Sequence, residues 1–237
     1  MLAAARRALG AHAHAVIGRS ATYAESELAA ALDQARALGV EPRVLATAEL
    51  DDPRFVGNPT NRCYFCKGEL YGKLAELARA EGIRHVLDGT NADDLRDFRP
   101  GRRAAGEHGV TSPLAEFGFA KADVRRLAAE LGLPSAEKPA MPCLSSRFPY
   151  GAAITPGALR QVEAGELWLR ARGFRDVRVR HYGDVAKIEV ESAAVARLSA
   201  PPLYDECVHA LTELGFRAVT IDPVGFRSGS LNEGVVR

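Results

Sequence analysis

Apolar and polar residues in the first half of the chain follow a pattern typical of strands and helices in alternation. Residues 12–17 alternate as a strand does, and the apolar residues of 23–38 recur at helical spacing up to Gly39, a typical residue after a helix. Residues 43–46 form the next expected strand. This order of strand, helix and strand predicts a parallel sheet of the α/β class.

The same pattern predicts three more helices and one more strand in this half. The helices are expected over residues 2–9, 63–80 and 120–131. The strand is expected over residues 85–87, and a polar segment follows it directly: Asp88, Gly89, Thr90 and Asn91. Ligands of open α/β sheets bind beyond the carboxyl ends of strands, so this segment is a candidate nucleotide contact, with a simple polar turn as the alternative.

A second region with a different order of elements follows residue 150. Its predicted elements are a helix, two strands joined at Gly183, a second helix and a last strand, over residues 156–172, 177–179, 185–190, 202–214 and 218–221. This order is typical of a small α+β domain. We therefore expect two domains, one of residues 1–150 and one of residues 151–237.

Composition narrows the class of protein. The 237 residues are 47% hydrophobic, and 31 basic residues balance 30 acidic ones, which gives no overall attraction to nucleic acid or anionic membrane. The basic segment 99–103 is expected to be a solvated turn. No run is long and apolar enough for a membrane span, and two arginines interrupt the apolar start, unlike a signal peptide. We expect a cytoplasmic protein with neither nucleic acid nor membrane as partner.

Cysteines carry the candidate chemistry, because thiols stay reduced in the cytoplasm and then serve metal binding or catalysis more than disulfides. Cys63 and Cys66 open a predicted helix three residues apart, and Cys143 lies in a loop that prolines at 139, 142 and 149 keep out of a regular helix. Structural zinc would need a fourth ligand. Three thiolates suit an iron-sulfur cluster with one open iron; a redox or nucleophilic CxxC, or unrelated structural cysteines, are the alternatives.

Five segments carry a specific resemblance that extends over nearly the whole chain. In chain order they are NPTNRCYFCKGELY, DGTNADDLRDFRPG, SPLAEFGFAKADVRRLAAELGLP, KPAMPCLSSRFPYG and GFRSGSLNE. Together they resemble the LarE-type ATP-dependent sulfur transferases of the PP-loop ATP pyrophosphatase superfamily. Other PP-loop enzymes share the sheet but lack the SSRFPYG block. The resemblance implies a doubly wound parallel sheet of the adenine nucleotide alpha-hydrolase type, followed by the small α+β domain.

The resemblance also implies an activity in the biosynthesis of the nickel-pincer nucleotide cofactor of lactate racemase. ATP, with Mg²⁺, adenylylates a carboxylate of pyridinium-3,5-biscarboxylic acid mononucleotide, and sulfur then displaces AMP to leave a thiocarboxylate. In one branch of the family the enzyme's own cysteine supplies the sulfur and becomes dehydroalanine. In the other, three cysteines hold a 4Fe-4S cluster that carries sulfide; Cys63, Cys66 and Cys143 favour this branch. The sacrificial route stays open, because the family cysteine aligns at Pro142 in some members.

Site residues follow from the same resemblance. Ser146, Glu166, Arg178 and Arg180 correspond to positions around the substrate nucleotide. Ser20 and residues 88–91 lie where the superfamily binds adenosine. Arg178 and Arg180 alternate along a strand, so they share one face and suit a phosphate; a solvated strand face is the alternative. The family also implies a homo-oligomer, a hexamer built from trimers, with the site between subunits.

One family feature has no counterpart, because no SGGxDS pyrophosphate loop and no other glycine-rich phosphate loop occurs in the chain. We therefore expect the ATP-binding domain to lack its first strand and that loop, which leaves the activity of this chain open. The alternatives are a non-catalytic remnant that binds a cluster or nucleotide, and another PP-loop thiolase.

Overall fold

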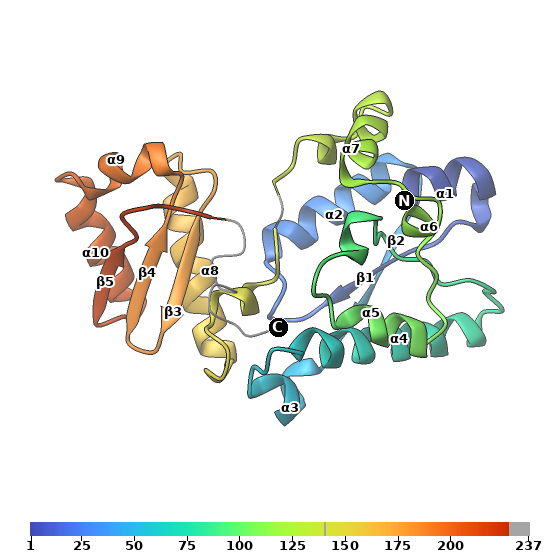
Figure 1. Cartoon of the computed structure of the whole chain (residues 1–237), viewed down its shortest axis with the longest axis horizontal. Helices are drawn as coiled ribbons and strands as arrows, with labels where there is room; N and C mark the ends of the chain where they lie inside the picture. Colours follow the sequence, from blue (N-terminus) through green and yellow to red (C-terminus); the bar gives the residue numbers. More distant parts are fainter. Residues whose placement is uncertain (140, 228–237) are drawn as a thin grey trace. The chain divides into compact units, whose positions relative to one another are not determined.

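The computed structural model describes residues 1–139 and 141–227, which form two compact units (Figure 1). Among these residues, the first unit comprises 1–55 and 59–139, and the second comprises 56–58 and 141–227. Residues 56–58 thus belong to the second unit although both flanking stretches belong to the first. The last segment of the family resemblance, GFRSGSLNE, lies outside the described residues from Ser228 on.

The first unit contains a two-stranded parallel sheet and most of the helices. Strand β1 (Ala15–Arg19) pairs with β2 (Pro42–Ala46) in a register from Ala15 opposite Pro42 to Arg19 opposite Ala46. The unit's α-helices are α1 (Leu2–Leu9), α2 (Glu25–Ala37), α4 (Arg62–Ala80), α5 (Gly101–Glu107), α6 (Pro113–Glu116) and α7 (Lys121–Glu130), and α3 (Pro53–Val56) leads into the second unit. Short 3₁₀ turns cover Gly10–His12, Glu49–Asp51, Asp93–Leu95 and Pro134–Ala136. The parallel pair and the long helices confirm the predicted α/β character.

Two predictions in this unit are wrong. Residues 85–87 form no strand; Leu87 makes a single parallel bridge with Thr111, held by 3.0 Å hydrogen bonds from Thr111 to Val86 and from Asp88 to Thr111. One bridge gives no ladder, so the segment stays irregular. The basic segment 99–103 is not a turn either, because helix α5 begins at Gly101 and buries Ala104 against α4.

The contact between α4 and α5 explains that second error. A side chain at Gly101 would come within 2.8 Å of the Lys67 side chain and 3.2 Å of the Cys63 backbone oxygen. Glycine therefore lets α5 approach the first turn of α4 closely, and the buried residues Tyr71, Ala104 and Val110 fill the interface. Tertiary packing stabilises a helix that local sequence does not favour.

The second unit is a three-stranded sheet with helices. Its strands are β3 (Arg178–Tyr182), β4 (Val185–Glu189) and β5 (Ala218–Ile221), in the order β3-β4-β5, with β3 and β4 antiparallel and β4 and β5 parallel. Its α-helices are α8 (Pro156–Ala171), α9 (Val195–Ser199) and α10 (Leu203–Glu213), and 3₁₀ turns cover Leu144–Arg147 and Ser192–Ala194. These elements confirm the predicted α+β pattern of this region.

Local sequence explains where these elements begin and turn. Thr155 accepts a 3.2 Å hydrogen bond from the backbone nitrogen of Ala158, and Pro156 occupies the first helical position of α8, where a missing N–H has no cost. Gly183 has a φ of 66° between β3 and β4, a conformation that favours glycine. No helix in the described part of the chain is both long and apolar enough to cross a membrane.

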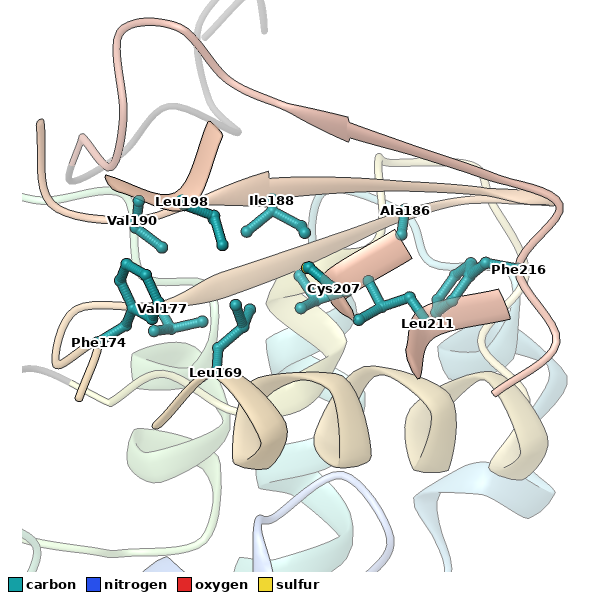
Figure 2. Close-up of a cluster of buried hydrophobic side chains, with 11 residues drawn as sticks. Leu169, Phe174, Val177, Ala186, Ile188, Val190, Leu198, Cys207, Leu211 and Phe216 are labelled. Atoms are coloured by element: carbon teal, nitrogen blue, oxygen red, sulfur yellow. The ribbon is translucent and has the colours of Figure 1, made fainter. Parts of the chain in front are cut away.

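The core of this unit lies between the sheet and its helices. Figure 2 shows Leu169 of α8 and Cys207 and Leu211 of α10 below strand β4, which carries Ala186 and Ile188. Cys207 is fully buried there. Burial raises the pKa of its thiol to about 11. The residues of the opposite strand face, Arg178, Arg180 and Glu189, are therefore available to build a polar cluster.

Candidate functional site

Helix α4 carries two of the candidate cysteines near its N-terminus. Cys63 is exposed and Cys66 half-buried, and their spacing puts both thiols on one side of the helix. None of Cys63, Cys66, Cys143 and Cys207 is in a disulfide. The start of α4 therefore carries two thiols of the first unit on one side of the helix.

Cys143 lies in the second unit, directly before the 3₁₀ turn Leu144–Arg147. Its side chain is half-buried. Its backbone oxygen accepts hydrogen bonds of 3.0 Å from the Ser146 nitrogen and from Nη1 of Arg147. Nη1 of Arg147 also donates to the oxygen of Pro142 at 2.7 Å. The predicted absence of a regular helix is confirmed, and Arg147 fixes the backbone that presents the thiol.

Arg147 itself is anchored by Glu166 of helix α8. Its Nε and Nη2 donate to the two oxygens of Glu166 at 2.7 and 2.8 Å, and the two side chains are 1% and 5% exposed. Glu166 also accepts hydrogen bonds from Arg170 at 3.1 Å and from the Val179 nitrogen at 3.2 Å. Such a two-pronged pair fixes direction as well as distance. Arg147 was not predicted as a site residue, although it stands inside the SSRFPYG block.

Arg178 and Arg180 lie on the strand face opposite the core, and both are buried. Arg180 pairs with Glu189 at 2.8 Å and donates to the backbone oxygen of Ser146, also at 2.8 Å. Arg178 donates to the oxygen of Val177 at 2.6 Å and lies 4.8 Å from the ring centre of Phe226. Burial, and then the charge of Arg147, lower the pKa of Arg178 to about 10. The alternative of a solvated strand face is wrong.

Cationic side chains gather around Arg178. The arginines close enough to lower its pKa by their charge are Arg147, Arg170 and Arg180. Ion pairs join the first two of these to Glu166 and the third to Glu189. Bringing so many guanidinium groups together away from water is costly unless anions offset their charge. In the second unit, Glu166 and Glu189 supply part of this compensation, and Ser146, Glu166, Arg178 and Arg180 lie in or beside the same arginine cluster.

In the first unit, Ser20 follows strand β1. Its Oγ donates a 2.5 Å hydrogen bond to Oε1 of Glu49 and lies 2.8 Å from Oγ1 of Thr22, which donates to the same oxygen at 2.8 Å. Glu49 is buried and stands after strand β2. Glu49 was not predicted as a site residue, since an acidic residue before a turn gives no local signal of burial.

Asp88 is the centre of the predicted nucleotide segment. One oxygen accepts hydrogen bonds from Oγ of Ser112 and the nitrogen of Thr90; the other accepts from the hydroxyls of Tyr71 and Thr90. Burial raises the pKa of Asp88, but these donors together outweigh it and leave that pKa below its ordinary value. Since both oxygens are engaged, Asp88 shapes the loop more than it offers a free acceptor.

Asn91 and Gly89, in the same segment as Asp88, have different surroundings. Asn91 accepts hydrogen bonds from the nitrogens of Asp93 and Asp94 and so starts a 3₁₀ turn, whereas Gly89 has open space beside it. Asp88 and Gly89 also line a largely apolar cavity of about 460 Å³ with residues of β1, α1, α2 and α4. Ser20 is not among the residues that line it. The structure thus brings Ser20 to Glu49 and Asp88 to Tyr71, in separate clusters.

The metal prediction concerns residues of both units, because Cys63 and Cys66 belong to the first and Cys143 to the second. Within residues 1–139 and 141–227, no three histidine, cysteine or acidic side chains are arranged to hold a metal ion. The three-cysteine cluster and the roles of the other predicted site residues stay predictions.

Three relatives show what the chain is similar to. It is 44% identical to an uncharacterized protein of Synechocystis sp. over 94% of this chain and 84% of the relative. It is 38% identical to the pyridinium-3,5-bisthiocarboxylic acid mononucleotide synthase of Lactiplantibacillus plantarum, over 94% of this chain and 80% of that enzyme. It is 32% identical to an uncharacterized protein of Methanocaldococcus jannaschii over 74% of this chain and 68% of that protein. No protein-family model matches the chain.

Proposed function

Since the chain belongs to the family of LarE-type sulfur transferases, we propose that it converts pyridinium-3,5-biscarboxylic acid mononucleotide to its thiocarboxylate at the expense of ATP. The observation that carries the proposal is the buried arginine cluster of the second unit. The proposed substrate bears a phosphate and two carboxylates, which are the anions that arginine binds best. The product belongs to the biosynthesis of the nickel-pincer nucleotide cofactor.

The proposed reaction has two displacement steps. A carboxylate oxygen of the substrate attacks the α-phosphorus of ATP, pyrophosphate leaves, and an acyl-adenylate forms. A sulfur nucleophile then attacks the acyl carbon and AMP leaves with the bonding electron pair. The first step makes AMP a good leaving group, which a carboxylate oxygen alone is not. Both steps release an anion, so cationic side chains favour them.

We assign the nucleotide and the substrate to different units. ATP with Mg²⁺ would bind to the first unit, as a doubly wound PP-loop domain, at Ser20 and residues 88–91. The substrate would bind to the second unit, with its phosphate at Arg178 and Arg180 and with Ser146 and Glu166 beside it. The hydrogen bond from Arg180 to the backbone of Ser146 supports this grouping, because it joins two of the assigned residues directly.

For the sulfur we favour a 4Fe-4S cluster held by Cys63, Cys66 and Cys143. The donors fit, since all three side chains carry thiols, none of them is fully buried, and two lie near the start of one helix. Such a cluster would supply an open iron position for a sulfide. The alternative is that Cys143 gives up its own sulfur; Arg147 then holds the backbone of the reacting residue.

A single-turnover experiment tests the proposal. The protein, purified without oxygen, is mixed with the dicarboxylate mononucleotide, ATP, Mg²⁺ and sulfide, and products are followed by mass spectrometry. We expect pyrophosphate, AMP and thiocarboxylate in equal amounts. A loss of about 34 Da from Cys143 would assign the sulfur to that residue, since elimination to dehydroalanine removes hydrogen sulfide. If ATP is consumed without substrate-dependent pyrophosphate release, the proposal is wrong.

A further inference from the structure

Glu49 joins the carboxyl ends of the two parallel strands of the first unit. Strand β1 ends at Arg19, directly before Ser20, and strand β2 ends at Ala46, just before the 3₁₀ turn that Glu49 begins. Its Oε1 accepts the hydroxyl hydrogens of Ser20 and Thr22 at 2.5 and 2.8 Å. This edge of a parallel sheet is where α/β proteins bind their ligands.

The other oxygen of this carboxylate, Oε2, is buried and has no hydrogen-bond partner among the described residues. Glu49 is only 2% exposed. A buried carboxylate oxygen without a donor is unfavourable because it has lost its water and gained nothing. Oε1 thus has two donors, and Oε2 has none among the described residues, which leaves Oε2 an unsatisfied acceptor.

Glu49 lines a polar cavity of about 320 Å³. The other carboxylates of that cavity are satisfied within the chain: Asp52 by Arg54, Glu69 by Lys73 and Glu107 by Arg103 and Tyr64. Tyr64 and Phe65 add aromatic surface. The volume is at the lower end of the range for small-molecule sites, about 300–1,000 Å³. Among the carboxylates of this cavity, Glu49 is the one with a buried oxygen that has no donor within the described residues.

The occupant must present hydrogen-bond donors. A carboxylate beyond the carboxyl end of a strand in a parallel sheet can accept hydrogen bonds from the hydroxyls of a nucleotide's ribose. Glu49 lies beyond the carboxyl end of β2, and its Oε1 accepts from Ser20, which follows β1.

We propose that Oε2 of Glu49 accepts the ribose hydroxyls of the bound nucleotide and makes the protein specific for ribonucleotides. The inference rests on the proposed function, because it takes ATP as the ligand of the first unit. Ser20 and Thr22 then act as positioning residues, which hold Oε1 so that Oε2 is turned away from them. Glu49 is the residue that touches the sugar.

Calorimetric titrations of the whole chain test this with three ligands, each with Mg²⁺: ATP, 2′,3′-dideoxy-ATP and ITP. ITP lacks the exocyclic amino group of adenine and so separates recognition of the base from recognition of the sugar. We expect ATP to bind about ten- to a hundredfold more tightly than dideoxy-ATP, as for hydrogen bonds to a charged group, and about as tightly as ITP. Glu49→Gln should reduce the sugar preference to about threefold or less, because the remaining hydrogen bond is uncharged.

Glu69→Gln is the matched control, since Glu69 lines the same cavity but its carboxylate pairs with Lys73. It should keep the sugar preference. Equal affinities of the natural protein for ATP and dideoxy-ATP overturn the inference without any variant, so a poorly folded Glu49→Gln cannot hide that result. If ITP binds more weakly than ATP while dideoxy-ATP binds as tightly as ATP, the nucleotide is recognised through its base and the inference is overturned. If ATP does not bind at all, the proposed function fails together with it.

Discussion

Arg180 donates a 2.8 Å hydrogen bond to the backbone oxygen of Ser146 and so ties strand β3 to the loop that carries Cys143. The same guanidinium pairs with Glu189 on the neighbouring strand. A single side chain therefore connects the sheet with the loop. A movement of Arg180 should consequently shift the backbone next to the Cys143 thiol. Arg178, by contrast, donates to the backbone of its own strand.

Arg178 is consequently the better probe of substrate binding. Arg178→Ala should weaken binding of the dicarboxylate mononucleotide by about ten- to a hundredfold, because it removes charge-assisted hydrogen bonds. ATP binding should hardly change. Titration calorimetry with each ligand measures both. Arg172→Ala is the control, since that guanidinium lies over the Trp168 ring, 3.5 Å from its centre, at the end of α8. Equal losses for both ligands would speak against separate sites.

The pair of Arg147 and Glu166 should dominate the stability of the second unit. Arg147→Met should lower the free energy of unfolding by about 3–5 kcal/mol, because a buried carboxylate then loses its main partner. Urea unfolding measures the difference. Arg126→Met removes an exposed pair with Asp123 and should cost at most about 1 kcal/mol. A small loss for Arg147→Met would mean that Arg170 and the backbone nitrogen of Val179 satisfy Glu166 without it.

The cysteine assignment makes a prediction about iron content. After anaerobic reconstitution we expect roughly four irons per chain, and Cys63→Ala, Cys66→Ala and Cys143→Ala should each abolish the cluster absorbance. Cys207→Ala is the control, because that sulfur is buried in the hydrophobic core. A protein that holds one zinc per chain and no iron would contradict the assignment, and so would full iron content in Cys143→Ala.

Cys207 should also impose a pH dependence on stability. Its pKa rises from 9.0 to about 11 on folding, so between these values the folded chain holds a proton that the unfolded chain has lost. The free energy of unfolding should therefore fall as pH rises from about 9 to 11. Cys207→Val should flatten this part of the curve, measured by urea unfolding at stepped pH. An unchanged slope would assign the fall to other groups.

Local sequence predicted the elements whose signals are local. Helix α8 has its capping threonine and first-position proline, and the turn between β3 and β4 has Gly183. Residues 85–87 look equally apolar, yet they make only one bridge, because a strand also needs a partner along its length. Helix α5 was missed for the reverse reason, since its stability comes from contact with α4.

The residues of the candidate site also divide into those that the sequence reveals and those that only the folded structure reveals. Cys63, Cys66 and Cys143 could be chosen from residue type and spacing, and Arg178 and Arg180 from alternation and the family resemblance. Arg147, Glu49 and Tyr71 could not, because each matters through a partner far along the chain: Glu166, Ser20 and Asp88. Burial of a polar side chain is a property of the folded structure, and no periodicity in the sequence records it.

Asn58 connects residues 56–58 to the loop 148–151 of the second unit. Its side-chain amide donates to the backbone oxygens of Phe148 and Pro149 at 3.4 and 2.8 Å, its own backbone oxygen accepts from Gly151, and its φ is 52°. The second unit is therefore not modular. A fragment cut before Met141 would lose residues 56–58 and leave two carbonyls without these donors, so domain dissection or gene fusion at that point should yield an insoluble product.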